Sequence, residues 1–284
     1  MNTDGLAVAV RGLRRSYGDR VAVDGVDLQV RTGEVVALLG PNGAGKTTTV
    51  EILEGYRRRD AGQVRVLGAD PATAGAAWRA RLGIVLQSTG EFDDLTVAEV
   101  VGHFAGLYPR AQDPAEVVAR VGLADSGRRR TRTLSGGQKR RLDVALGIVG
   151  RPELLFLDEP TTGFDPQARR EFWELIRGLA GAGTTILLTT HYLDEAEALA
   201  DRVAVIAAGR IVEVAAPADL GGRRDAPAVV AWRDPAEGAR RRETHTPAAL
   251  VAELAAAYGG EVPGLTVSRP SLEDTYLRMI GATA

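Results

Sequence analysis

A glycine-rich segment at residues 40–47 constrains the fold of this chain more than any other feature. It reads Gly-Pro-Asn-Gly-Ala-Gly-Lys-Thr, follows an apolar run at 35–39 and precedes residues 48–53, which have the pattern of a helix. A strand, a G-x-x-x-x-G-K-[ST] loop and a helix in this order form a phosphate-binding loop. A glycine-rich turn can match such a pattern by chance, but the flanking strand and helix favour the phosphate loop.

The residues of this loop suit a nucleoside triphosphate. Glycine lets the backbone wrap closely around an anion, and the first turn of the following helix offers unpaired N–H groups and a positive dipole end. Lys46 can reach the β- and γ-phosphates, and the Thr47 hydroxyl can hold Mg²⁺. We therefore expect the phosphates to contact Gly40, Pro41, Asn42, Gly43, Ala44, Gly45, Lys46, Thr47 and Thr48.

Composition excludes several other classes of protein. The 284 residues suggest about two domains, and the net charge of -2 argues against a nucleic-acid partner. Without cysteine the chain has neither disulfides nor thiolate metal sites. All but two of its 35 basic residues are arginine, so it is suggestive that one of the two lysines is Lys46.

No segment reads as a membrane span or a secretory signal. Residues 1–5 lack a basic region followed by an apolar stretch, and apolar runs such as 203–208 fall far short of the ~20 residues that a span requires. We expect a soluble, cytoplasmic protein. If it serves a membrane process, another subunit must provide the membrane part.

Strands and helices alternate along most of the chain, which predicts a largely parallel sheet covered by helices. The expected strands lie at 6–11, 26–30, 63–67, 81–87, 153–158, 185–190 and 203–206. The expected helices lie within 96–121, from 135 past 148, at 167–179 and at 193–199.

Residues 221–227 contain Gly, Arg and Pro and read as a linker to a small α/β appendage. There we expect strands at 229–233 and 265–268, a helix capped by Thr246 and opened by Pro247, and a last helix from Ser271, closed by Gly281. The pattern of this appendage indicates packing rather than chemistry.

Two acidic residues, Asp158 and Glu159, follow the apolar run at 154–157. Many strands end in exposed acids, so the pair is informative only because a phosphate loop precedes it in the same chain. Asp158 is then the expected Mg²⁺ ligand, and Glu159 lies where it can polarise an attacking water.

A second anion-binding pattern comprises Leu134, Ser135, Gly136, Gly137 and Gln138. A serine at a helix start with free glycine amides can face a phosphate. Taken alone, the segment favours an ordinary helix N-cap with a flexible entry.

In combination, these motifs resemble an ATP-binding-cassette (ABC) ATPase over residues 6–215, with Tyr17, Gln87, Asp165 and His191 at matching positions. The resemblance implies a P-loop NTPase cassette at 1–220. It would contain a RecA-like parallel-sheet core, an antiparallel β subdomain and a helical subdomain at about 92–145. Residues 221–284 would form the small C-terminal α/β appendage.

The resemblance also implies roles for single residues. Tyr17 would stack on the adenine of ATP, although it could be an ordinary surface tyrosine. Gln87 would contact Mg²⁺ or the attacking water and link the core to the helical subdomain, unless it makes only local hydrogen bonds. Glu159 would be the catalytic base, assisted by Lys46, and His191 would sense the γ-phosphate, although a lone histidine is more often structural.

In such ATPases the signature motif of one cassette closes over ATP held by another. One copy of each motif here implies a head-to-tail homodimer, with Ser135 and Gly137 reaching the partner's γ-phosphate and Asp165 coupling the two sites. Phe164 stands where the family usually has leucine, which leaves the detail of that coupling open.

Segments 54–56, 161–166 and 192–196 look most like drug-export ATPases of the daunorubicin-resistance type, as does the tail at 270–277. This implies a separate integral-membrane permease, contacted through residues 92–96. It also implies a peripheral location on the cytoplasmic face of the membrane and a cargo of drugs, lipids or other hydrophobic compounds. The alternative is a soluble ABC ATPase of translation or DNA repair, which usually has a second cassette or a long coiled coil.

Overall fold

The computed structural model describes residues 4–85 and 92–281. Its chain divides into two compact units, Met1–Val214 and Ala215–Ala284. The first unit contains a central sheet, an antiparallel sheet and a group of helices, and the second contains a small sheet with helices. The predicted division into domains 1–220 and 221–284 places the boundary slightly later and remains a prediction.

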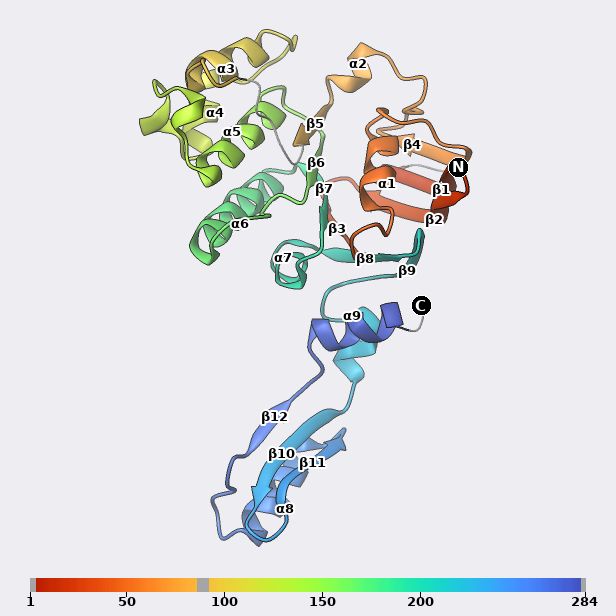
Figure 1. The fold of residues 1–284 in the computed structure, drawn as a ribbon, viewed down its shortest axis with the longest axis vertical. Helices are drawn as coiled ribbons and strands as arrows, with labels where there is room; N and C mark the ends of the chain where they lie inside the picture. Colours follow the sequence, from red (N-terminus) through yellow and green to blue (C-terminus); the bar gives the residue numbers. More distant parts are fainter. Residues whose placement is uncertain (1–3, 86–91, 282–284) are drawn as a thin grey trace. The chain divides into compact units, whose positions relative to one another are not determined.

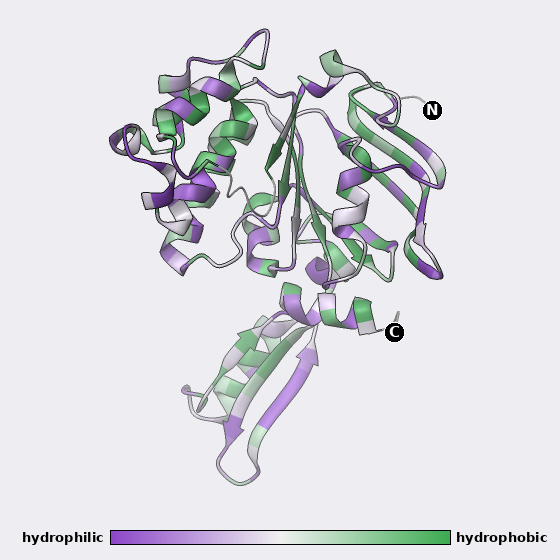
Figure 2. Cartoon of the chain, turned by 45° about the horizontal axis from the view of Figure 1, so that its top comes forward, coloured by the Kyte–Doolittle hydropathy of each residue, from purple (hydrophilic) through white to green (hydrophobic). Residues whose placement is uncertain are grey.

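The central sheet has six strands in the order β5-β6-β7-β3-β8-β9, and the first five pair in parallel (Figure 1). Every residue of β3 and β7 is buried, as expected for strands covered on both faces. Figure 2 shows these strands in the green of apolar residues. The strands are β3 (Val35–Leu39), β5 (Leu82–Val85), β6 (Leu154–Asp158), β7 (Thr185–Thr190), β8 (Arg202–Ala207) and β9 (Arg210–Ala215).

A separate antiparallel sheet has the order β2-β1-β4 and is built from β1 (Leu6–Tyr17), β2 (Arg20–Arg31) and β4 (Ala61–Val66). The first two strands are each 12 residues long, and so much longer than their alternating segments predicted. Tyr17 pairs with Arg20, so only two residues form the hairpin turn. Apolar residues of this sheet share one buried core with α1 (Lys46–Leu53).

Three helices form the helical subdomain. Each is preceded by a residue whose side chain accepts a backbone N–H group of the first turn. Thr96 and Ser135 each form a capping box, and Asp113 accepts two backbone N–H groups. The helices are α3 (Val97–Ala105), α4 (Pro114–Arg120) and α5 (Gly136–Ile148), with short 3₁₀ turns η1 (Ala124–Ser126) and η2 (Thr131–Thr133). The α5 helix ends at Ile148 rather than continuing beyond it.

The remaining helices of the first unit are α2 (Ala76–Arg79), α6 (Pro166–Gly181) and α7 (Leu193–Leu199). Predicted bounds for α7 and β7 agree with the structure at both ends. Within the part of the chain that the structure describes, no helix combines the length and apolar character needed to cross a membrane.

The second unit forms a sheet in the order β11-β10-β12, whose apolar side packs on a helix through Val230, Leu250 and Leu254. Its elements are η3 (Leu220–Asp225), β10 (Ala228–Asp234), β11 (Gly238–Thr244), α8 (Pro247–Ala257), β12 (Thr266–Ser268) and α9 (Leu272–Gly281).

Three expectations for the second unit are wrong in detail. The proposed linker at 221–227 is not wholly irregular, because residues 223–225 belong to the kinked 3₁₀ segment η3, in which Gly221 and Gly222 have left-handed φ angles of 57° and 71°. Leu220 at its start is buried, and α9 packs against η3. Thr246 precedes α8 but makes no capping bond, and Gly281 is the last residue of α9 rather than a stop beyond it. The Ser271 cap is present, with its hydroxyl accepting the Asp274 N–H at 3.0 Å.

Candidate active site

The glycine loop connects the end of β3 to the start of α1, and its glycines are required by geometry. Gly43 and Gly45 have φ angles of 79° and 103°, which L side chains rarely adopt. A Cβ at Gly45 would lie 2.4 Å from the Ala22 carbonyl oxygen, and one at Gly40 would lie 2.3 Å from that of Ile206. Neither position can accept a side chain without moving a strand.

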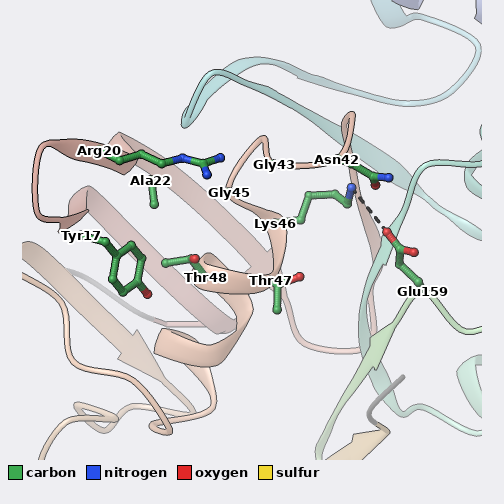
Figure 3. A pocket seen from close by; sticks show the side chains of 10 residues that line it. All are labelled: Tyr17, Arg20, Ala22, Asn42, Gly43, Gly45, Lys46, Thr47, Thr48 and Glu159. Atoms are coloured by element: carbon green, nitrogen blue, oxygen red, sulfur yellow. Dashed lines mark ion pairs between the residues drawn. The ribbon is translucent and has the colours of Figure 1, made fainter. Parts of the chain in front are cut away.

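The loop borders a cavity of about 390 Å³, within the usual range for small-molecule sites. Its lining comes from the β1–β2 hairpin, the loop, the first turn of α1 and the end of β6 (Figure 3). Among the described residues, no protein acceptor pairs with the backbone N–H groups of Asn42, Gly43, Gly45 or the first three residues of α1. These amides are therefore available to an anion, as phosphate-binding loops require.

Lys46 is buried at the centre of the site, with 5% of its surface exposed. Its Nζ donates to the Gly40 carbonyl at 2.7 Å and to the Pro41 carbonyl at 3.2 Å, and lies 3.6 Å from Glu159 Oε1. Burial lowers the pKa of Lys46, and the carboxylates of Glu159 and Asp158 oppose that shift. An ammonium held this way is placed to receive phosphate charge.

Asp158 and Glu159 lie at the end of β6, beside the end of β7. The Thr189 hydroxyl on β7 donates to Asp158 Oδ1 and accepts the Glu159 N–H at 3.0 Å. Glu159 Oε1 is 3.2 Å from His191 Nδ1, although the pair lacks hydrogen-bond alignment and this buried nitrogen has no aligned partner in the described chain. The fold thus brings Lys46, Glu159 and His191, three of the predicted site residues, close together.

The predicted metal ligands are only partly tested by this geometry. Thr47 lines the cavity and Asp158 ends the neighbouring strand, whereas Gln87 lies outside the described residues. Within the described ranges, no group of three His, Asp or Glu side chains could hold a metal alone. The donor set fits Mg²⁺ that binds together with nucleotide, since this ion commonly takes one or two protein ligands plus phosphate oxygens.

Tyr17 borders the cavity from the last position of β1. The guanidinium carbons of Arg15 and Arg57 lie 4.8 Å and 5.4 Å from its ring centroid, close enough for cation–π contact. Arg20 from β2 also lines the cavity and points toward Gly43 in Figure 3. Sequence reasoning missed Arg20, although the short hairpin places any residue paired with Tyr17 beside the loop.

The signature residues lie elsewhere on the chain. Leu134 is buried, and Ser135 bonds Gln138 in the capping box of α5, whereas Gly136 is exposed and Gly137 is partly exposed. None of them lines the cavity beside the glycine loop.

The segment after β6 has a structural role within this chain. Asp165 caps α6 by accepting the Gln167 and Ala168 N–H groups, both at 2.9 Å. The Phe164 ring contacts buried Phe172 edge-on, with centroids 5.7 Å apart, so part of its extra bulk packs internally. Its effect on coupling between sites remains a prediction.

The comparisons with known proteins agree with the motifs. The ABC transporter family model matches residues 23–162. Daunorubicin resistance ATP-binding protein DrrA3 of Streptomyces coeruleorubidus is 46% identical, over 72% of this chain and 67% of its own length. DrrA2 of the same species is 40% identical over 98% of this chain and 96% of its own. The chain belongs to the ABC transporter family. It is an ATP-binding, ATP-hydrolysing subunit of that family, which confirms the resemblance noted from the sequence.

Two further comparisons agree with this family. The Nod factor export ATP-binding protein I of Paraburkholderia xenovorans is 43% identical, over 75% of this chain and 72% of its own. A solved ATP-binding subunit of an ABC transporter superposes with a TM-score of 0.68 and 26% identity, covering 77% of this chain and 92% of the other. The predicted cassette fold with extra C-terminal strands and helices is confirmed.

Proposed function

We propose that this ABC subunit drives the export of drugs or other hydrophobic compounds through a separate membrane-spanning permease. The similarity to daunorubicin-resistance and Nod factor export subunits supports an exporter. The cargo would be contacted by the permease rather than by this chain, which would bind peripherally at the cytoplasmic face. The exposed Asp93, Asp94 and Leu95 before α3 would contact the permease, and dimer closure would be transmitted to this segment through Gln87.

The working unit is a head-to-tail homodimer of cassettes. The observation that carries this proposal is the separation of the two phosphate-binding motifs, since the signature lies outside the cavity beside its own glycine loop. A second copy would supply Ser135 and Gly137 to the γ-phosphate, and Asp165 would contact the opposite site. Nucleic acid is not an expected partner.

Hydrolysis would begin with an exchange of partners at Lys46. In the present geometry Lys46 Nζ is 3.6 Å from Glu159 Oε1, and an arriving γ-phosphate offers it a stronger anionic partner. Glu159 is then free to accept the proton of the attacking water, and His191 Nδ1 is available to the γ-phosphate. Adenine would stack on Tyr17.

Mg²⁺ would accompany ATP, held by Thr47, Asp158 and Gln87 beside the phosphate oxygens. When bound, it neutralises charge that develops on the phosphates. The loop amides and Lys46 would hold the phosphates, and Glu159 would hold the attacking water.

The dimer is tested with Glu159→Gln, which keeps the shape of the side chain but removes the base. With ATP, the variant should elute as a stable dimer and turn over slowly, whereas with ADP it should remain monomeric. Ser135→Arg in the Glu159→Gln background is the matched control and should prevent the dimer. Elution of Glu159→Gln as a monomer at saturating ATP would contradict the proposed closure.

Export is tested by co-expressing the chain with the membrane protein encoded beside it. Inverted membrane vesicles should accumulate daunorubicin when ATP is supplied, and vesicles with Glu159→Gln should not. Association with ribosomes or DNA, without any membrane partner, would instead favour the soluble class of ABC ATPase.

A further inference from the structure

The backbone of the proposed catalytic base has an unusual conformation. Glu159 has a φ of 43°, in the left-handed region that costs energy for every residue with a Cβ. Such conformations persist only where surrounding groups hold them, and they concentrate at functional sites. The orientation of the Glu159 carboxylate depends on this dihedral angle. Whatever holds the angle therefore also positions the base.

Two elements hold the backbone around Glu159. From β7, the Thr189 carbonyl and hydroxyl both accept the Glu159 N–H, at 3.1 and 3.0 Å. From α5, the Arg140 guanidinium donates to the carbonyls on either side, through Nη2 to Asp158 O at 2.7 Å and through Nε to Pro160 O at 2.9 Å. The peptide group before Glu159 is thus bonded on both sides, at its carbonyl by Arg140 and at its N–H by Thr189, and Arg140 also bonds the carbonyl of the next residue, Pro160.

The Arg140 side chain is buried, so its charge is held there at a cost in desolvation free energy. Only 6% of the residue's surface is exposed, and its Nη1 lies 3.7 Å from Asp143 on the same helix. Burial lowers the pKa of Arg140, and the nearby carboxylates oppose that shift. A planar guanidinium can donate to two carbonyls in fixed directions, which a lysine ammonium on its flexible chain does less well.

The position of Arg140 connects two motifs. It lies on α5, the helix that Ser135 caps and whose first residues are Gly136 and Gly137. Because a helix of 13 residues moves largely as one body, a displacement of the signature end also displaces the guanidinium. The same helix that carries the signature motif therefore contacts the backbone of the base.

We propose that Arg140 is a positioning residue for ATP hydrolysis, which holds Glu159 in its left-handed conformation and links that conformation to the signature helix. The inference rests on the proposed role of Glu159 as base. When the signature motif of one chain contacts ATP bound to a second copy, the resulting shift of α5 would change the position of Glu159 in the first chain. Hydrolysis in one site would thus respond to closure of the other.

The test compares Arg140→Met and Arg140→Lys with Arg141→Met in the full chain. Arg141 is the matched control, since it bonds the Val121 carbonyl and Glu171, away from the glycine-loop cavity. We expect Arg140→Met to lower kcat by about 10- to 100-fold with the Kd for ATP nearly unchanged, because Arg140 does not line the cavity. Arg140→Lys should be intermediate, and Arg141→Met should keep its kcat.

A double-mutant cycle separates positioning from general stability. If Arg140 acts through Glu159, Arg140→Met should have almost no further effect on kcat in a Glu159→Gln background. A folded Arg140→Met with the kcat of the unmodified chain would overturn the inference. So would equal losses in kcat for Arg140→Met and Arg141→Met.

Two further outcomes are decisive. If Arg140→Met does not fold, Arg140→Lys decides by the same kcat and Kd criteria. Full activity of Glu159→Gln would overturn the proposed base itself, together with this inference. An inactive Glu159→Gln beside a fully active Arg140→Met would overturn this inference alone.

Discussion

Replacing Thr189 by valine tests the geometry of the site most directly. Thr189 is fully buried, and its hydroxyl donates to Asp158 Oδ1 while accepting the Glu159 N–H. Valine has almost the same shape but no hydroxyl, so Thr189→Val removes both bonds with little change in packing volume. The variant therefore reports what these two hydrogen bonds contribute to stability and catalysis.

The expected magnitude follows from the kind of bond. A hydrogen bond to a charged group contributes about 1.5–3 kcal/mol, and the Asp158 bond is of this kind. The second bond matters less, because the Glu159 N–H keeps the Thr189 carbonyl at 3.1 Å. We expect the free energy of unfolding to fall by about 2–3 kcal/mol. If the transition state for hydrolysis loses most of this stabilisation, kcat falls about 10- to 100-fold.

The assay combines urea unfolding, phosphate release and binding of a fluorescent ATP analogue. Thr185→Val is the matched control, because Thr185 is buried on the same strand and its hydroxyl accepts the Gly33 N–H at 3.0 Å, outside the glycine-loop cavity. Both variants should lose stability, but only Thr189→Val should lose kcat, and both should bind ATP normally. Equal kcat values for the two variants would refute the reasoning.

Three further predictions concern the loop and the groups around it. Gly45→Ala should abolish ATP binding in equilibrium titration, since its Cβ would lie 2.4 Å from the Ala22 carbonyl oxygen at a φ of 103°; near-normal affinity would contradict this. Burial and two nearby carboxylates raise the pKa of Glu54 to about 7, against 4.5 for a free side chain. In the folded state its carboxyl therefore keeps its proton as the pH rises from 4.5 to 7, whereas in the unfolded chain it ionises. The free energy of unfolding falls over this range by up to about 3 kcal/mol. Glu54→Gln should unfold at a higher temperature than the unmodified chain above pH 7, but at a similar temperature near pH 4. Arg20→Met should weaken ATP binding by roughly tenfold through loss of one charge-assisted contact, whereas a loss confined to kcat would exclude that contact.

Local sequence patterns predicted much of the secondary structure. The apolar runs of β3, β6 and β7 are buried strands, and Ser135 caps its helix. The elements that the sequence patterns missed are set by contacts with other parts of the fold. The strand β11 contains three adjacent arginines and no apolar alternation, and it is a strand because it pairs with β10. The segment predicted as a linker contains a kinked 3₁₀ element, which begins at the buried Leu220.

The sequence also predicted a set of site residues, but not the groups that contact them in the structure. Arg20, Arg140 and Thr189 carry no motif, and their importance appears only from what they contact. Thr189 could have been suspected because it is a hydroxyl residue at the end of an apolar strand. Nothing in the sequence around Arg140 distinguishes it from its two basic neighbours.

The sequence by itself determined the phosphate-binding loop and the family. The motif is eight contiguous residues, and the dihedral angles of Gly43 and Gly45 are local properties. Tertiary structure decided how the predicted base, Glu159, is held. Glu159 is fixed by Thr189, which is 30 residues away, and by Arg140, which bonds Asp158 from 18 residues away. Only the packing of β6 against β7 and α5 brings these groups within hydrogen-bond distance.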